Sequence, residues 1–227
     1  RLHTQQPQGD HARVGGVIHA IIAMEVVLHQ VTKSFGREVV LRGVSHTFAS
    51  GSRTALLGPN GSGKSTLLQV IAGVLAPTSG AVTHGLKGAT LDPALVYRHI
   101  VIAAPYLGLY EDLSLREVIG FHQRFKPLLP GIGLDELAHI AYLQRDLEKP
   151  VRHFSSGMKQ RLKLALAILS DTPLLLLDEP CSNLDTEAVR WYGDLLRQHI
   201  GDRTLLVASN RQATETALCQ AALDLDR

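Results

Sequence analysis

The chain has 227 residues, 45% of them hydrophobic and 19% charged, so it is long enough for one sizeable core or two small lobes. This composition excludes a disordered or low-complexity chain. With 23 basic and 21 acidic residues the formal net charge is +2, which gives no broad electrostatic case for nucleic-acid binding. The two cysteines, Cys181 and Cys219, are too few for a disulfide framework, so we expect buried or half-buried thiols in a reducing, cytosolic protein.

The first 23 residues are polar and then briefly apolar. Arg13 before a short apolar stretch weakly resembles a secretory signal peptide. We favour the alternative that translation begins at Met24 and that residues 1–23 are an upstream extension outside the fold. Polar residues interrupt the longest apolar stretch, 14–28, so no window reaches the roughly 18 to 20 apolar residues of a membrane-spanning helix.

From Met24 onward the chain alternates short β-branched runs with Gly36, Gly43 and Gly51, which we expect at turns. This pattern predicts a small strand-rich lobe. The apolar run 174–177 suits a strand that is buried on both faces of a parallel sheet. Strands and helical patterns alternate along the chain, so the predicted class is α/β.

One helical pattern follows the strand-rich lobe, and three more lie in the middle of the chain. Their predicted ranges are 65–74, 114–125, 134–147 and 157–170, and prolines separate the last three. No internal repeat is visible, so a solenoid is not expected.

Residues 58–66 read G-P-N-G-S-G-K-S-T and match the phosphate-loop pattern G-x-x-x-x-G-K-[ST]. They follow the apolar stretch 54–57 and open a helical pattern, which is the strand–loop–helix context that the motif requires. Glycines let backbone N–H groups point at phosphate oxygens, and the helix N-terminus adds partial positive charge. The candidate phosphate-binding residues are Gly58, Pro59, Asn60, Gly61, Ser62, Gly63, Lys64, Ser65 and Thr66.

Within this loop we expect Lys64 to reach the β and γ phosphates of a nucleotide, and Ser65 to offer its hydroxyl to Mg²⁺. Thr66 is expected to hydrogen-bond the α-phosphate. The alternative, a glycine-rich turn with a surface lysine, does not explain the strand before the loop and the helix after it.

The apolar run 174–177 ends in Asp178 and Glu179. On the same sheet as the phosphate loop, Asp178 can hold Mg²⁺ and Glu179 can orient the water that attacks the γ-phosphate. Taken alone, the same letters could mark a strand that simply leaves the core.

Residues 154–161 read F-S-S-G-M-K-Q-R at the predicted start of a helix. Ser155 and Ser156 are good helix caps, and a helix start of no special function is the plainer reading. A serine hydroxyl, exposed N–H groups and a helix dipole also make an anion site. A second phosphate-facing surface of this kind suggests a second subunit.

Together these motifs resemble the ATP-binding cassette family, specifically the nucleotide-binding subunit of a transporter, from Met24 to about Gln212. Residues 58–66 resemble the Walker A loop, 174–179 resemble Walker B, and 154–158 are similar to the signature L-S-G-G-Q. The resemblance places Ser155, Ser156 and Gly157 on a nucleotide and Asp185 in the D-loop. It also places the ring of Phe35 under the adenine, although by itself Phe35 would more readily be a core residue.

The resemblance implies an α/β fold of the P-loop NTPase (RecA-like) type, with a parallel sheet core, an N-terminal antiparallel β lobe and an inserted α-helical subdomain over about 106–168. Residues 24–227 would form a single ATP-binding domain that uses ATP and Mg²⁺. It would pair head to tail with a second ATP-binding subunit and serve a transmembrane permease at the cytoplasmic face of the membrane.

Two positions depart from the family pattern. Where the family carries a glutamine that touches Mg²⁺, this chain has Pro105 or Tyr106, and where it carries a histidine near the γ-phosphate, this chain has Asn210 after Ser209. Asn210 can donate a hydrogen bond but cannot carry a proton's charge, so we expect slow hydrolysis. Ser156 and Met158 are milder departures within the signature.

Two alternatives follow. One is a nucleotide-gated subunit of a heteromeric complex that closes on ATP and hydrolyses it weakly. The other is a cassette ATPase that serves no transporter, which 227 residues fit poorly. The eleven histidines show no metal-ligand spacing. The densest basic stretch, Lys159, Arg161 and Lys163, is expected to be a solvated helix face, and no nucleic-acid partner is expected.

Overall fold

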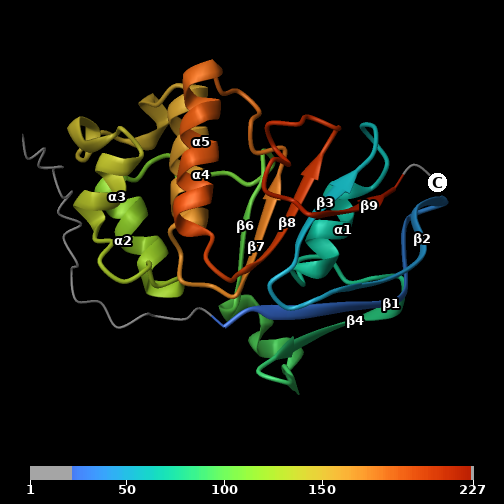
Figure 1. Cartoon of the computed structure of the whole chain (residues 1–227). Coiled ribbons are helices and arrows are strands. Elements are labelled where there is room, and N and C mark those ends of the chain that lie inside the picture. Colours follow the sequence, from blue (N-terminus) through green and yellow to red (C-terminus); the bar gives the residue numbers. More distant parts are fainter. Residues whose placement is uncertain (1–21, 226–227) are drawn as a thin grey trace, which may run out of the picture.

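The computed structural model describes residues 22–225, so the prediction for the first 23 residues falls almost wholly outside the described residues. The described chain forms two sheets with helices on both sides of the larger one (Figure 1). The strands are β1 (Met24–Phe35), β2 (Glu38–Phe48), β3 (Arg53–Leu57), β4 (Ser79–Leu86), β5 (Ala89–Thr90), β6 (Ile100–Ala103), β7 (Leu174–Asp178), β8 (Thr204–Ser209) and β9 (Ala221–Asp224). The helices are α1 (Lys64–Ile71), α2 (Leu115–Phe125), α3 (Leu134–Ile140), α4 (Ser156–Ile168) and α5 (Thr186–His199), with 3-10 helices η1 (Pro93–Arg98), η2 (Gln144–Asp146) and η3 (Val151–His153). The alternation confirms the predicted α/β class.

The smaller sheet is antiparallel, with strand order β2-β1-β4-β5, and it is the predicted N-terminal β lobe. β1 buries Met24, Val26 and Leu28 on one face. The prediction of a turn at Gly43 is wrong. Gly43 lies inside β2 with φ 60°, where the pairing of β1 with β2 shifts register. A glycine in the left-handed region fits such a bulge because it carries no Cβ.

The larger sheet is parallel, with strand order β6-β7-β8-β3-β9. β7 lies between β6 and β8, and its four leucines are completely buried. This confirms the predicted strand over 174–177. Because all five strands run the same way, the loops after β3, β6, β7 and β8 leave the sheet at one edge.

The leucines of β7 divide between two cores because successive side chains of a strand point to opposite faces. Leu175 and Leu177 pack with residues of α2, α3, α4 and α5, whereas Leu174 and Leu176 pack with α1 and the β lobe. In Figure 1, α4 and α5 stand side by side on one side of the sheet and α1 lies on the other. The sheet is therefore clamped from both faces.

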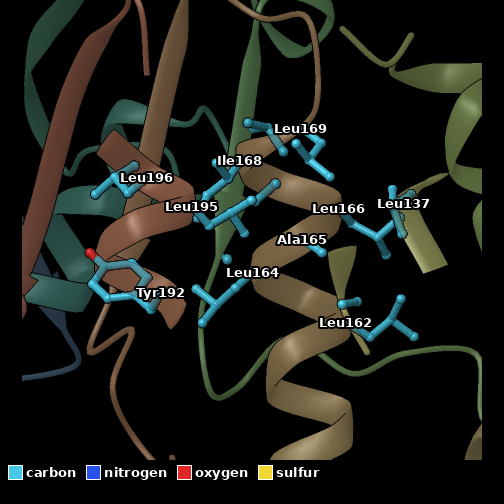
Figure 2. Close-up of a cluster of buried hydrophobic side chains, with 14 of the residues drawn as sticks. Leu137, Leu162, Leu164, Ala165, Leu166, Ile168, Leu169, Tyr192, Leu195 and Leu196 are labelled. Atoms are coloured by element: carbon cyan, nitrogen blue, oxygen red, sulfur yellow. The ribbon is translucent and has the colours of Figure 1, made fainter. Parts of the chain in front are cut away.

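The first of these cores is centred on α4. Figure 2 shows Leu164 and Ile168 directed toward Tyr192 and Leu195 of α5, while Leu166 points toward Leu137 of α3. α4 therefore presents apolar side chains in two directions, and its position is set by both the helical region and α5.

The helical region begins with α2, where Ser114 caps the helix and Glu117 closes a capping box. The helix predicted over 134–147 is shorter in the structure. α3 ends at Ile140, and Tyr142 follows in the left-handed region with φ 58°, which a helix interior does not allow. Among residues 22–225, no helix combines the length and apolar character needed to cross a bilayer.

Arg203 is fully buried just before β8. Its guanidinium donates hydrogen bonds to the carbonyl oxygens of Ile168 (2.8 Å), Ser170 (3.0 Å), His199 (2.5 Å) and Ile200 (3.1 Å). These carbonyls lie at the C-terminal ends of α4 and α5, where the last carbonyls have no partner within the helix. The carbonyls of Ser170 and Ile200 also accept hydrogen bonds from the backbone N–H groups of Thr172 (3.0 Å) and Arg203 (3.2 Å). Burial lowers the pKa of Arg203 to about 10, which the charge of Asp171 opposes. One side chain thus caps two helices.

We expect Arg203→Met to lower the free energy of unfolding by about 3 kcal/mol, because it removes four buried side-chain hydrogen bonds, including those to the carbonyls of Ile168 and His199. Urea denaturation followed by circular dichroism measures the change. The control is Arg197→Met on the exposed face of α5, where loss of the exposed ion pair with Asp194 should cost less than about 1 kcal/mol. Equal midpoints for the two variants would contradict the capping role of Arg203.

Candidate functional site

The phosphate loop, residues 58–66, connects β3 to α1 as the motif predicts. Gly61 and Gly63 have φ of 85° and 94°, values that side-chain-bearing residues rarely adopt. A Cβ on Gly63 would also lie 2.9 Å from the Leu41 side chain of β2, so a glycine is needed there. The first N–H groups of α1 have no partner within the helix. Together with the positive end of the helix dipole, they are free to bind an anion.

Lys64 is 4% exposed, although it carries the charge of the loop. Its ammonium donates hydrogen bonds to the carbonyl oxygens of Gly58 (2.7 Å) and Pro59 (2.8 Å). These bonds fold the loop back around the ammonium, and Ser65 and Thr66 are half-buried beside it. The loop is therefore already shaped around a positive charge.

Asp178 ends β7 and is 1% exposed. Within the described residues, neither of its carboxylate oxygens makes a hydrogen bond of acceptable geometry. Burial raises the pKa of Asp178 and the charge of Glu179 raises it further, while the Ser65 hydroxyl and the Lys64 ammonium favour the ionised form. A buried carboxylate without partners is costly unless a cation joins it. The Asp178 and Ser65 oxygens therefore fit Mg²⁺, which prefers oxygen ligands.

Glu179 follows in a strained backbone conformation, with φ 42°. Its N–H donates to the carbonyl of Ala208 in β8 (3.0 Å), and its carboxylate accepts a hydrogen bond of 3.4 Å from the Ser182 hydroxyl. The side chain is half-buried. Glu179 can therefore reach solvent while its backbone is held against the sheet.

The loop after β6 holds the two residues in the family's glutamine position. Both Pro105 and Tyr106 are exposed, and Tyr106 is the one that senses Asp178. Burial of its hydroxyl and the charge of Asp178 raise the pKa of Tyr106 to about 12, whereas a hydrogen bond with Gln69 of α1 lowers it. The Tyr106 hydroxyl is thus close enough to Asp178 to be influenced by its charge, in the loop where the family resemblance predicts a glutamine and this chain has none.

The loop after β8 carries Asn210. Asn210 is exposed, whereas Ser209, which ends β8, is completely buried and hydrogen-bonded to Glu215. Sequence reasoning did not single out Glu215, because an acid in a polar loop after a strand matches no motif. One signal could have drawn attention to Glu215. It lies shortly after β8, and β8 pairs with β7, which runs into the two acids Asp178 and Glu179.

The signature segment begins α4. Ser155 is its N-cap and accepts a hydrogen bond from the Met158 N–H (3.2 Å), and both Ser155 and Ser156 are exposed. Gly157 packs against the D-loop, since a Cβ there would lie 3.5 Å from the Asn183 carbonyl oxygen. The segment is a capped helix start, and the anion site predicted there stays a prediction.

Asp185 and Phe35 are the remaining predicted site residues. Asp185 is exposed and caps α5 by accepting a hydrogen bond of 2.8 Å from the Ala188 N–H. Phe35 is 49% exposed at the end of β1, so the reading of Phe35 as a core residue is wrong. The ammonium of Lys33 lies 5.1 Å from the centre of its ring. The free ring surface can stack on a planar ligand.

The structure brings one group of predicted residues together and leaves the others apart from it. One group lies at the carboxyl edge of the parallel sheet, at the end of a strand or in the loop after it. Its members are the phosphate loop, Asp178, Glu179, Tyr106 and Asn210. Phe35 lies on the β lobe, and the signature segment lies at the start of α4. The edge of the sheet is the usual place for a ligand in an open α/β fold.

The basic stretch on α4 differs from the prediction. It is half-buried rather than solvated. Lys159 pairs with Glu111 at 2.6 Å, and Lys163 donates a hydrogen bond to the Ala104 carbonyl (3.2 Å) in the loop after β6. These lysines therefore join α4 to neighbouring loops. Cys181 is buried and Cys219 half-buried, both as free thiols, as predicted.

An apolar groove of about 440 Å³ lies between β6, the loop after it, and α2. Its rim carries exposed aromatic side chains, with the rings of Tyr110 and Phe121 4.9 Å apart and those of Phe121 and Phe125 5.1 Å apart. Lys163 lines the same groove. Contiguous exposed apolar patches on a protein surface commonly mark a site of interaction with a partner or ligand.

Comparisons with known proteins agree with this geometry. Residues 41–182 match the family model described as ABC transporter. The chain is similar to the Nod factor export ATP-binding protein I of Rhizobium meliloti, with 33% identity over 88% of this chain and 61% of that protein. It is also similar to the cytochrome c biogenesis ATP-binding export protein CcmA of Rhizobium meliloti (strain 1021), with 32% identity over 83% of this chain and 92% of CcmA.

Solved structures give the same result for the fold. A structure of the ATP-binding subunit of an ABC transporter superposes with a TM-score of 0.75 and 27% identity, over 88% of this chain and 85% of that one. A dimeric ATP-binding cassette in a post-hydrolysis state with ADP and Pi gives 0.74 at 24% identity, covering 88% and 94%. The predicted P-loop NTPase fold is confirmed. The chain spans only 61% of the Nod factor relative's length.

Proposed function

Because the chain belongs to the ATP-binding cassette transporter family, we propose that residues 24–227 form one domain that binds and hydrolyses ATP to power a membrane transporter. One observation carries the proposal. The buried Lys64 ammonium and the buried Asp178 carboxylate, which has no hydrogen-bond partner among the described residues, lie at the same edge of the sheet without pairing, and Glu179 is next in the chain. Opposite charges held in this way have a clear use in phosphoryl transfer.

The phosphates of ATP would enter the phosphate loop, where Lys64 exchanges loop carbonyls for β and γ phosphate oxygens and Thr66 bonds the α-phosphate. Ser65 and Asp178 would hold Mg²⁺, which when bound supplies positive charge against the charge that develops on the phosphate. Glu179 accepts a hydrogen bond from the attacking water and orients it. The exposed ring of Phe35 stacks on the adenine.

The proposed active unit is a dimer. Ser155, Ser156 and Asp185 are exposed, and the N–H groups in the first turn of α4 offer a positive helix end to an anion. In a head-to-tail pair, this surface and Gly157 would cover a nucleotide held by the phosphate loop of the partner subunit. Closure would exclude water from the site and bring in the signature segment, which couples ATP binding to movement.

The partner in the membrane would be a permease subunit, with this chain on its cytoplasmic face. The names of the relatives support a transporter over a non-transport ATPase, since they include the export protein CcmA and the zinc import ATP-binding protein ZnuC of Yersinia enterocolitica, which is 31% identical over 75% of its length. The aromatic groove is the surface for that partner. Leu107 and Gly108 line this groove, so an occupant would contact the loop that carries Tyr106.

A second candidate function rests on Asn210. A neutral amide in the place of a histidine, together with Tyr106 in the place of a glutamine, favours a subunit that closes on ATP but hydrolyses it weakly. In that case a sister subunit would supply the faster site.

We expect Glu179→Gln to lower steady-state phosphate release by at least about 100-fold, because the amide cannot accept a proton from the attacking water. ATP should still bind, so size-exclusion chromatography with ATP should show a dimer for this variant. The control is Glu187→Gln, an exposed acid in the first turn of α5, which should keep the parental rate. Equal phosphate release by the parent and Glu179→Gln would contradict the proposed role.

We expect Asn210→His to raise a low parental turnover by at least about tenfold, since an imidazole can exchange a proton within the working pH range. Phosphate release at saturating ATP measures the change. A parental turnover near the median of enzymes, about 10 per second, would exclude the weakly hydrolysing alternative.

We expect Phe121→Asp to abolish copurification with the permease subunit of the proposed complex, because it places a charge in the aromatic cluster. Affinity purification after co-expression measures this, with ATPase activity of the isolated variant as the folding check. Tyr142→Asp, at an exposed aromatic outside the groove, should leave the complex intact. Retention of the permease by Phe121→Asp would contradict the assignment of the groove.

A further inference from the structure

Glu215 is a buried acid that belongs to none of the motifs. It is 1% exposed, and both carboxylate oxygens are used. One accepts a hydrogen bond from the Ser209 hydroxyl (2.5 Å) and the other from the Cys181 N–H (3.1 Å). The carboxylate therefore joins a loop after β8 to a loop after β7.

The loop after β7, which we name the β7 turn, spans residues 178–182 and carries Glu179. Within its backbone, the Glu179 N–H donates to the Ala208 carbonyl, the Ser182 N–H donates to the Glu179 carbonyl (3.0 Å), and the Cys181 carbonyl accepts from the Leu184 N–H (3.2 Å). Because Glu179 has a positive φ, the turn needs restraint from its surroundings to keep this conformation.

Two side chains supply that restraint from opposite directions. The amide of Gln160, on α4, donates to the Pro180 carbonyl (2.9 Å), and the Glu215 carboxylate accepts from the next N–H group, that of Cys181. Both contacts are buried. The backbone immediately after Glu179 is therefore held between α4 and Glu215.

The second loop, which we name the β8 turn, spans residues 209–215 and carries Asn210. Ser209 accepts a hydrogen bond from the Gln212 N–H (3.0 Å), and the Glu215 N–H donates to the Gln212 carbonyl (3.1 Å). With Ser209 donating to Glu215, the turn closes on itself around that carboxylate. Glu215 is thus built into one turn and grips the other.

The position of Glu215 is electrostatically unfavourable, which argues against a role as filler. Burial raises its pKa, the bonds from Ser209 and Cys181 lower it, and the charges of Glu179 and Asp178 raise it again. A buried acid near two others is a cost that an apolar residue of similar volume would avoid.

We propose that Glu215 is a positioning residue for ATP hydrolysis, which holds the β7 turn so that Glu179 faces the attacking water and links it to the β8 turn that carries Asn210. The inference rests on the proposed function, since it concerns the reaction of Glu179. Glu215 touches neither the phosphate loop nor Lys64 among its described hydrogen bonds, so nucleotide binding should not depend on it.

The test compares Glu215→Ala with Glu215→Gln. The alanine variant loses both side-chain bonds, whereas the glutamine amide can still accept from the Cys181 N–H and bond the Ser209 hydroxyl. Both variants keep the bond from the Tyr192 hydroxyl to the Glu215 backbone carbonyl (3.2 Å). We expect Glu215→Ala to lower kcat by about tenfold or more with the affinity for a fluorescent ATP analogue within about twofold, and Glu215→Gln to stay within about threefold of the parent.

Arg203→Met serves as the matched control, because it destabilises the fold away from the carboxyl edge of the sheet and should leave kcat unchanged below its melting temperature. A loss of kcat in Glu215→Ala no larger than that in Arg203→Met would overturn the proposal. A glutamine variant as slow as the alanine variant would also overturn it, because the hydrogen bonds would then not be the cause.

Hydrogen–deuterium exchange separates this inference from the proposed function. Exchange over residues 179–184 should be faster in Glu215→Ala than in the parent and unchanged in Glu215→Gln, whatever the parental turnover. A parent without ATPase activity would contradict the proposed function, while unchanged exchange in Glu215→Ala would contradict the positioning role by itself.

Discussion

The burial of β7 on both faces is the constraint on which the rest of the structure depends. Its leucines enter two separate cores, so the strand can neither slide nor turn without emptying both of them. Asp178 is the last residue of that strand, and its carboxylate is consequently placed with the precision of the core rather than of a loop. The neighbouring strands β6 and β8, and β3 beyond β8, end at the same edge of the sheet and bring their own loops to it.

Charge is distributed at this edge in a way that a ligand would complete. The Lys64 ammonium is satisfied by loop carbonyls, whereas Asp178 has no hydrogen-bond partner among the described residues and Glu179 reaches solvent. The Lys64 ammonium and the Glu179 carboxylate act on the pKa of Asp178 in opposite directions, the first lowering it and the second raising it, and none of the three forms an ion pair with another. Such preorganised charge needs little rearrangement when phosphate arrives.

Local patterns predicted much of this arrangement. The β7 strand, the phosphate loop and the capped start of α4 follow from apolar runs, glycines and capping serines, all of which act within a few residues. The predicted helix over 134–147 failed because the left-handed Tyr142 has no signal of its own. The buried contacts of Glu215 and Lys163 could not be predicted either, because their partners lie in distant segments of the chain. Only the folded chain shows that Glu215 meets the Cys181 N–H and that Lys163 meets the Ala104 carbonyl.

α4 has one further consequence. Ser155 at its exposed start, Gln160 against Pro180 and Lys163 against Ala104 lie along a single helix, which the α3 and α5 contacts keep straight. The backbone hydrogen bonds of an α-helix fix the spacing of its residues along the axis. A displacement of α4 at Ser155 would therefore move both the turn after β7 and the loop after β6. These two segments, which both follow strands of the parallel sheet, would then shift at the same time.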